Sequence, residues 1–296
     1  MSSPTAGEPS FRMSVSELTT MRWELAEEIE RISAHRFEAI AIWRTKLSDV
    51  GVAGARRMLR RAGMGVSSLQ WAGGFTGSDG RTFRESVEDA REAILAASAL
   101  GCGVVVIQPG CRGGHTLGHA HRLLCEAMEI LVPEASDRGV TLAIQPSHAG
   151  SPSGCGFLTR VASALEWVDR FDHPGVALAL DLWQFGGEAA LPSLLSDLVR
   201  RLAVVKVADR VGPPSAGVDR LLPGRGTLPL ESLVAALTAL GYRGWIEFEI
   251  VGEATDGTGY DGTLRQVREV ADRWSGRHQA PPAQRGHRWA DAPTTR

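Results

Sequence analysis

Lysine is almost absent from this sequence. The chain holds 32 lysines and arginines in 296 residues, but only Lys46 and Lys206 are lysines. Lys206 lies in the middle of an otherwise apolar run, LAVVKVADR at 202–210, where taking an ammonium group out of water costs free energy. A lysine at such a position needs a specific reason, either a charged partner or a chemical role.

Other features that are missing exclude several classes of protein. No apolar run reaches 18 residues, so no membrane span is expected. The first ten residues lack the basic and apolar segments of a secretory signal. A net charge of −2 gives no general attraction to nucleic acid or to anionic membranes. The four cysteines show no CxxC motif and no zinc spacing, so reduced thiols in a cytoplasmic protein are expected: Cys102, Cys111, Cys125 and Cys155.

Strand-like and helical segments alternate between the two ends of the chain. The strand-like segments are 11–19, 37–43, 64–72, 102–110, 140–146, 176–183, 203–209 and 244–250. The helical segments are 23–36, 51–63, 82–101, 117–139, 159–171, 190–202, 228–241 and 261–274. Strict alternation predicts an α/β fold with a parallel sheet covered by helices, and eight such units predict a single (β/α)8 TIM barrel.

The alternative fold is an open doubly wound sheet. Its dinucleotide-binding version is disfavoured because no GxGxxG follows the first strand-like segment. We expect a barrel over 12–275, and disordered tails at 1–11 and 276–296, where no apolar period is seen.

The working residues of such a barrel belong at the carboxyl ends of its strands and in the loops that follow. Glu247 and Glu249 are two residues apart and therefore share one face of their strand. The polar and aromatic residues at these ends, or in the loops after them, are Gln145, His148, Asp181, Trp183, Lys206, Asp209, Arg220, Glu247 and Glu249.

Five segments in order make a more specific pattern: GVTLAIQPSHAG, VALALDLWQFGG, VVKVADR, DRLLPGRG and GYRGWIEFEI. Together they resemble the xylose isomerase-like barrels, the family of sugar phosphate isomerases and epimerases, over roughly residues 12–275. The resemblance implies a small-molecule substrate of the polyhydroxy carbonyl class. It also makes assembly into a homo-oligomer an expectation.

The family usually binds one divalent metal on Glu, Asp, His and Glu side chains at strand ends. By resemblance these positions fall on Gln145, Asp181, Lys206 and Glu249, so two of the four ligands are changed. An ammonium has no lone pair for a metal. We therefore expect no metal and no other cofactor, with Lys206 in the cation's place and in salt bridges to Asp181 and Glu249. The alternative is one divalent metal (Mn, Mg, Zn or Co) on Asp181, Glu249 and Gln145.

Three functions stay open. The first is an isomerase or epimerase that works by proton transfer, with Glu249, Lys206, Asp181 and Gln145 as catalytic residues. Glu249 would be the base and Lys206 would replace the metal's charge. The second is a Schiff-base lyase or aldolase, because a desolvated lysine attacks carbonyl groups. The third is a binding protein or pseudoenzyme with a structural Lys-Asp-Glu triad.

The remaining side chains are predicted to contact the substrate, and each also has a plainer interpretation. The predicted contacts are His148, Asp209, Arg220, Trp183 and Glu247. Lys206 could point outward with its stem packed against the helices. Glu247, deeper on its strand than Glu249, could simply pair with Lys206.

Overall fold

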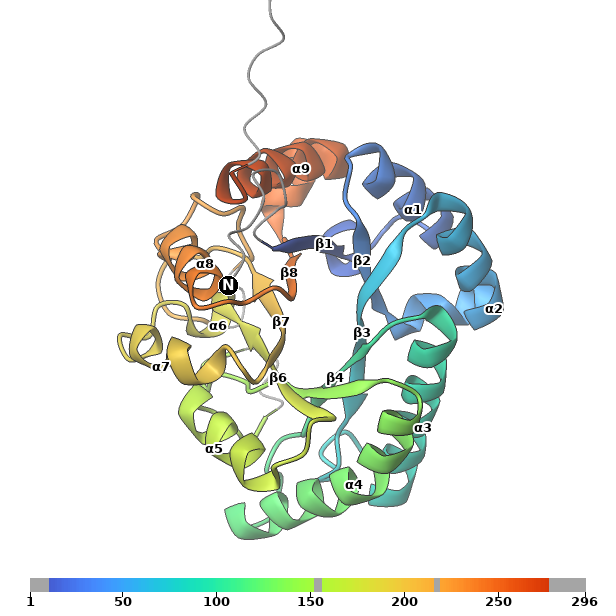
Figure 1. Cartoon of the computed structure of the whole chain (residues 1–296), viewed down its shortest axis with the longest axis vertical. Coiled ribbons are helices and arrows are strands. Elements are labelled where there is room, and N and C mark those ends of the chain that lie inside the picture. The colour runs from blue at the N-terminus through green and yellow to red at the C-terminus, as the bar shows by residue number, and fades with distance from the viewer. Residues whose placement is uncertain (1–10, 152–155, 216–218, 277–296) are drawn as a thin grey trace, which may run out of the picture.

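The computed structural model describes residues 11–151, 156–215 and 219–276, and these form one closed barrel (Figure 1). Every strand pairs in parallel with its neighbours in chain order, and the last strand pairs with the first. The strands are β1 (Arg12–Ser16), β2 (Ala39–Trp43), β3 (Gly65–Gly73), β4 (Val104–Gln108), β5 (Thr141–Ile144), β6 (Val176–Asp181), β7 (Leu202–Val207) and β8 (Trp245–Phe248). The predicted TIM barrel is therefore confirmed.

Helices surround the barrel, as Figure 1 shows. They are α1 (Leu25–Ala34), α2 (Arg44–Ala62), α3 (Phe83–Leu100), α4 (Leu117–Asp137), α5 (Val161–Phe171), α6 (Leu182–Phe185), α7 (Leu191–Leu198), α8 (Leu230–Ala239) and α9 (Glu253–Trp274), with a 3-10 helix η1 at Glu17–Thr20. None of these helices is long and apolar enough to cross a membrane. The predicted tails at 1–11 and 276–296 lie almost wholly outside the described residues.

Capping residues define both ends of α3, which was predicted at 82–101. Thr82 accepts a hydrogen bond from the Glu85 backbone N–H, and Glu85 accepts one from the Thr82 backbone N–H, which is a capping box. Gly101 ends α3 in the left-handed conformation. The prediction for α2 was shorter than the helix observed, because the chain already turns helically at Arg44 and continues past a kink at Gly51, whose φ is 67°.

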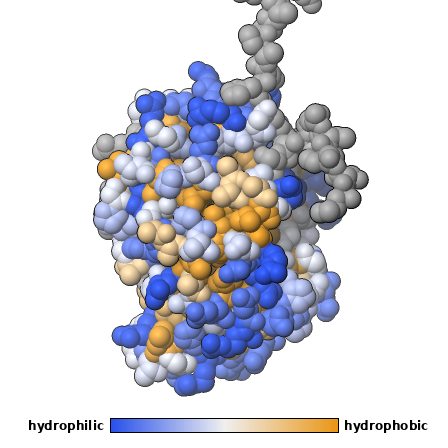
Figure 2. All heavy atoms as spheres, turned by 60° about the vertical axis from the view of Figure 1, so that its left-hand side comes forward, coloured by the Kyte–Doolittle hydropathy of each residue, from blue (hydrophilic) through white to orange (hydrophobic). Residues whose placement is uncertain are grey.

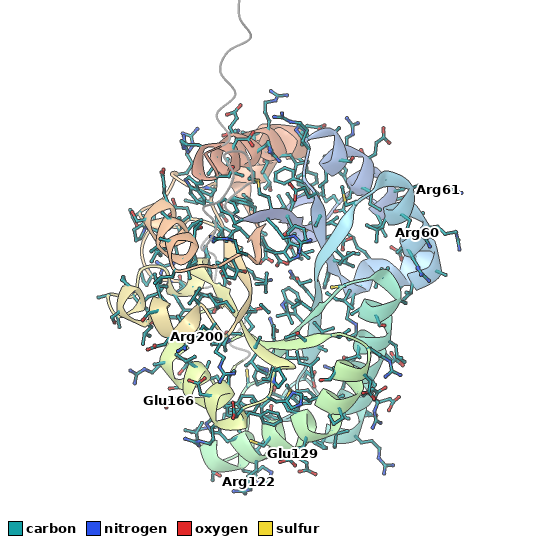
Figure 3. All side chains as sticks on the ribbon, viewed as in Figure 1. Arg60, Arg61, Arg122, Glu129, Glu166 and Arg200 are labelled. Atoms are coloured by element: carbon teal, nitrogen blue, oxygen red, sulfur yellow. The ribbon has the colours of Figure 1, made fainter. Side chains whose placement is uncertain are left out.

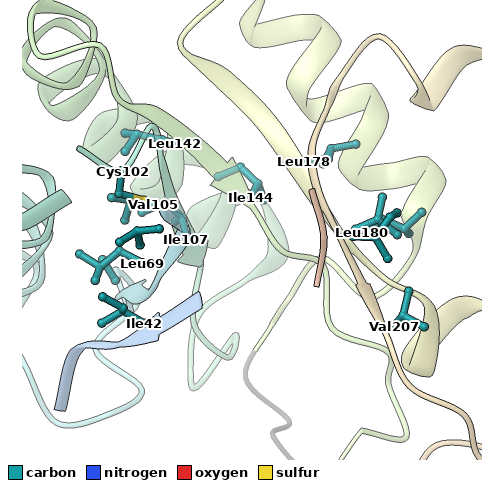
Figure 4. Close-up of a cluster of buried hydrophobic side chains, with 14 of the residues drawn as sticks. Ile42, Leu69, Cys102, Val105, Ile107, Leu142, Ile144, Leu178, Leu180 and Val207 are labelled. Atoms are coloured by element: carbon teal, nitrogen blue, oxygen red, sulfur yellow. The ribbon is translucent and has the colours of Figure 1, made fainter. Parts of the chain in front are cut away.

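The two faces of each strand differ in what they pack against. Residues facing the helices are large and apolar, including Val105, Ile107 and Leu180 in Figure 4. Residues facing the barrel interior include Ala39, Val106, Ala143, Ala179, Val204 and Trp245. The alanines among them leave room inside the barrel for long polar side chains at the carboxyl ends of the strands.

On the face shown in Figure 2, an apolar area lies among residues that are mostly hydrophilic. Arg60 and Arg61 on α2 project outward from the barrel in Figure 3, and both are exposed.

Candidate active site

Charged side chains converge at the carboxyl end of the barrel. Asp181, Lys206 and Glu247 each lie two residues beyond an interior-facing residue, namely Ala179, Val204 and Trp245. Because strand side chains alternate, all three enter the barrel. Glu249 follows β8 on the same face, and each of these four residues is at most 2% exposed. Three strands thus bring four charges into a space screened from water.

Lys206 points inward, as predicted, and has no exposed surface. Its Nζ donates hydrogen bonds to Glu249 Oε2 at 2.9 Å and to Gln70 Oε1 at 2.9 Å. The Trp71 ring centroid lies 5.2 Å from Nζ, within range of a cation–π interaction. The predicted ion pair with Glu249 is therefore present.

Asp181 has a different partner from the one predicted. The Arg220 guanidinium binds it with both terminal nitrogens, Nη2 to Oδ2 at 2.6 Å and Nη1 to Oδ1 at 3.3 Å. Nη1 also lies 3.3 Å from Glu249 Oε1. The prediction of a Lys206–Asp181 salt bridge is wrong, because the fork of an arginine can reach both carboxylates at once.

The loop after β7 carries Arg220 to Asp181 and Glu249. Arg220 pairs with Val251 and Leu221 pairs with Asp209 through antiparallel backbone bridges, so the loop lies back across the strand ends. The guanidinium then stacks on Trp183, 4.7 Å from its ring. Trp183, which was predicted to contact the substrate, thus packs against the guanidinium of Arg220.

The two cations determine the protonation of the two acids. Burial alone would raise the pKa of Glu249, but Lys206 and Arg220 hold this pKa below its ordinary value. Burial likewise opposes ionisation of Asp181, and Arg220 and then Lys206 bring the pKa of Asp181 below its ordinary value. Both groups are therefore carboxylates at neutral pH.

Glu247 lies deeper and forms no direct salt bridge with Lys206 among the described residues. Ser67 Oγ donates to its Oε1 at 2.7 Å, and Gln70 Nε2 donates to its Oε2 at 3.3 Å. Burial raises the pKa of Glu247, although Lys206 opposes that shift. The prediction of a Glu247–Lys206 pair is corrected, since the Gln70 amide lies between them.

Gln70 is the site residue that the sequence interpretation missed. The pairing register between β3 and β4 shifts between Gln70 and Ala72. As a result the consecutive residues Gln70 and Trp71 both reach the interior, where Trp71 Nε1 donates to Gln145 Oε1 at 3.3 Å. Strict alternation would have placed only one of them there.

Gln184 extends this network toward the rim. Its Nε2 donates to Asp181 Oδ2 at 3.0 Å, and its Oε1 accepts from the His148 backbone N–H at 2.8 Å. His148 lines a cavity of about 580 Å³, together with Gln184, Arg210 and Glu188. Its predicted contact with substrate would therefore be made in that cavity, beside the ion cluster.

Asp209 has the contacts of a loop anchor. Its Oδ1 accepts hydrogen bonds from the Arg210 and Leu228 backbone N–H groups, and its Oδ2 accepts one from Gly224. The structure thus gives Asp209 a role in shaping the loop that carries Arg220, which differs from the predicted contact with substrate.

The residues present do not fit a divalent metal. The two carboxylates at the centre, Asp181 and Glu249, already have cationic partners, and the other two ligand positions hold Lys206 and the amide of Gln145. Within the described parts of the chain, no group of three His, Cys, Asp or Glu side chains is arranged to hold a metal ion. A hard cation prefers several oxygen ligands and here would meet two positive groups.

A family model described as "xylose isomerase-like TIM barrel" matches residues 29–274, and the chain belongs to this family. A structure of a protein from Sinorhizobium meliloti 1021 superposes with a TM-score of 0.80 at 23% identity, covering 90% of this chain and 98% of that one. The fold and the family inferred from the sequence are confirmed.

Two curated relatives are named as enzymes. A 3-dehydroshikimate dehydratase of Pseudomonas putida is 23% identical over 242 residues, which cover 77% of this chain and 36% of the relative. A putative hydroxypyruvate isomerase of Streptomyces coelicolor is 28% identical over 182 residues, covering 58% and 60%. The chain therefore spans about a third and three fifths of these relatives. Their names agree with the expectation that this chain is an enzyme.

Proposed function

We propose that this protein is an isomerase or a related lyase that moves a proton next to the carbonyl group of a small polyhydroxy compound. The observation that carries the proposal is the pair of cations, Lys206 and Arg220, which flank the buried Glu249 carboxylate. The site combines a base with positive charge, which are the two needs of enolate chemistry.

Glu249 would take the proton from the carbon beside the substrate carbonyl. The electrons of that C–H bond form a carbon–carbon double bond, and the carbonyl electrons move onto oxygen. Lys206 and Arg220 stabilise the resulting oxyanion, so the chain's own side chains supply the positive charge that a divalent metal would otherwise supply. Arg220 must then release Glu249 Oε1, and at 17% side-chain exposure it is the most accessible member of the cluster.

The fate of the enolate decides the reaction. Isomerisation results when the proton is returned to the former carbonyl carbon and the α-hydroxyl passes its own proton to the enolate oxygen, so that the α-carbon becomes the new carbonyl. Dehydration results when the carbonyl re-forms and the β-hydroxyl leaves with the proton as water. Epimerisation through two opposed bases is disfavoured, because the second base position holds Gln145, an amide that cannot accept a proton at neutral pH. The site thus favours one-base chemistry, and isomerisation and dehydration are also the reactions in the names of the two curated relatives.

Schiff-base chemistry has less support. It needs Lys206 Nζ to be free to attack a carbonyl carbon, whereas Nζ donates hydrogen bonds to Glu249 Oε2 and Gln70 Oε1, each at 2.9 Å. Homo-oligomer formation and a cytoplasmic location remain predictions.

Proton transfer can be tested by deuterium exchange. Purified protein treated with a chelator would be incubated in D₂O with hydroxypyruvate, dihydroxyacetone and D-fructose, and deuterium beside the carbonyl would be followed by NMR. We expect exchange into at least one compound, and its loss in Glu249→Gln. Glu231→Gln, on the exposed first turn of α8, is the matched control. Exchange that survives Glu249→Gln would exclude Glu249 as the base.

A further inference from the structure

We infer that the substrate reaches beyond the reacting carbons into a second pocket at the ends of β3 and β4, which takes a neutral hydroxylated chain or ring. This inference rests on the proposed function for the reacting end of the site. The pocket has a volume of about 200 Å³ and is lined by Trp71, Gly73, Asp79, Arg81, Gln108 and Cys111, among others.

Trp71 links this pocket to the ion cluster. The Trp71 side chain lines the pocket, and its ring centroid lies 5.2 Å from Lys206 Nζ. Its Nε1 also donates a hydrogen bond to Gln145 Oε1. A substrate bound at Lys206 can therefore extend along the Trp71 ring into this pocket while staying within the mouth of the barrel. Indole faces pack well against the C–H faces of hydroxylated rings and chains.

Gln108 supplies hydrogen-bonding capacity without a partner. It lies two residues after Val106, which faces the barrel interior, so the Gln108 side chain enters the mouth on the same face. Among the described residues, its amide makes no hydrogen bond with another side chain or with the backbone. An amide offers both a donor and an acceptor, as a hydroxyl group requires.

The floor of the pocket is backbone. Gly73 has a φ of 127°, and a Cβ there would overlap the Gln108 carbonyl oxygen. No larger residue fits at this close approach of β3 to β4. The pocket is therefore a consequence of how the two strand ends meet.

The charges around the pocket favour a neutral ligand. Arg81 Nε donates to Asp79 Oδ2 at 2.9 Å, and Arg81 Nη1 lies 2.8 Å from Asp89. Since the Arg81 guanidinium is already paired with two carboxylates, it is not free to bind a phosphate or carboxylate. A volume of 200 Å³ corresponds to about seven water molecules at about 30 Å³ each, which suits a hydroxylated fragment of a few carbons.

The test compares a three-carbon probe with a six-carbon probe. Isothermal titration calorimetry would measure binding of dihydroxyacetone and D-fructose to the wild type and to Gln108→Met, which keeps the length of the side chain but removes its amide. We expect affinity for D-fructose to fall about five- to ten-fold and affinity for dihydroxyacetone to stay unchanged. Gln266→Met on α9, where Gln266 bonds only its own helix backbone, is the control.

A second variant, Cys111→Phe, places a ring in the pocket and should weaken D-fructose binding alone. The inference is overturned if the wild type does not bind D-fructose, or if both variants bind it as the wild type does. It is also overturned if the variants lose affinity for D-fructose and dihydroxyacetone equally. These outcomes are separate from failure of the proposed function, which would appear as bound D-fructose and dihydroxyacetone that exchange no deuterium.

Discussion

The chain has two lysines, and both are buried beside carboxylates in different electrostatic settings. Lys206 and Arg220 together face Asp181 and Glu249, whose pKa values are lowered. Lys46 lies in the first turn of α2, and its Nζ lies 2.5 Å from Glu28 Oε1 on α1.

The Lys46 cluster has one cation for two acids. Burial raises the pKa of Glu28 to about 7, although Lys46 opposes the shift, and burial together with Glu28 raises the pKa of Glu17. Buried acids with enough cations stay charged, whereas acids that share one cation retain a proton. The carboxylates beside Lys206 and Arg220 are thus ionised and can act as a base, whereas the Lys46 cluster only holds η1 and α1 against α2.

The largest effect is expected from Lys206→Met. The change leaves Glu249 buried with Arg220 as its remaining ion-pair partner, and breaking a buried pair typically costs about 3–5 kcal/mol. The urea midpoint should fall by a corresponding amount, and deuterium exchange should disappear. A stability loss below about 1 kcal/mol would mean that the ion pair contributes little to folding.

Lys46→Met should cost less, about 1–3 kcal/mol at pH 8, because Glu28 can take up a proton when its partner is lost. The cost should shrink further at pH 5.5, where protonation is easier. Urea unfolding at both pH values would measure this. Equal costs for the two lysine variants at pH 5.5 would contradict the distinction between the clusters.

The two clusters should also give stability opposite dependences on pH. At Glu28 the folded state binds a proton more tightly than the unfolded state does. The contribution of Glu28 to the free energy of unfolding is therefore fully present below pH 4.5 and is lost as pH rises through about 7. The pKa values of Asp181 and Glu249 are lowered, so their contribution is present above pH 4.5 and is lost as pH falls through the folded values.

The variant Glu28→Gln tests how much Glu28 contributes to the pH dependence of stability. The variant should lose the decline of unfolding free energy between pH 4.5 and 7 and keep the acid-side decline. An unchanged profile would assign the slope to another group, and Glu17 would then be the next variant to measure.

The smallest effect is expected from Glu247→Gln. Burial raises the pKa of Glu247, so replacing its carboxylate by an amide should change stability by about 1 kcal/mol or less. Glu249→Gln, two residues along the strand, should abolish exchange while Glu247→Gln retains it. Comparable loss of exchange in both would show that the deeper acid also takes part.

The sequence predicted the barrel because strand and helix periodicity repeats along the chain and needs no knowledge of distant contacts. The inward direction of Lys206, Asp181 and Glu249 followed from strand ends. The partner of Asp181 did not, because Arg220 reaches it through the backbone bridge to Val251. Gln70 was missed because a register shift, which leaves no pattern in the sequence, turns two consecutive residues inward.

The central claim is that Lys206 and Arg220 supply the site's positive charge. Calorimetric titration of Mn²⁺ into metal-free protein tests it most directly, with the double variant Lys206→His, Arg220→Met as a positive control that frees two carboxylates and adds a ligand. We predict no binding to the wild type and binding of about one ion to the double variant. One Mn²⁺ per wild-type chain, lost on Asp181→Asn, would contradict the claim.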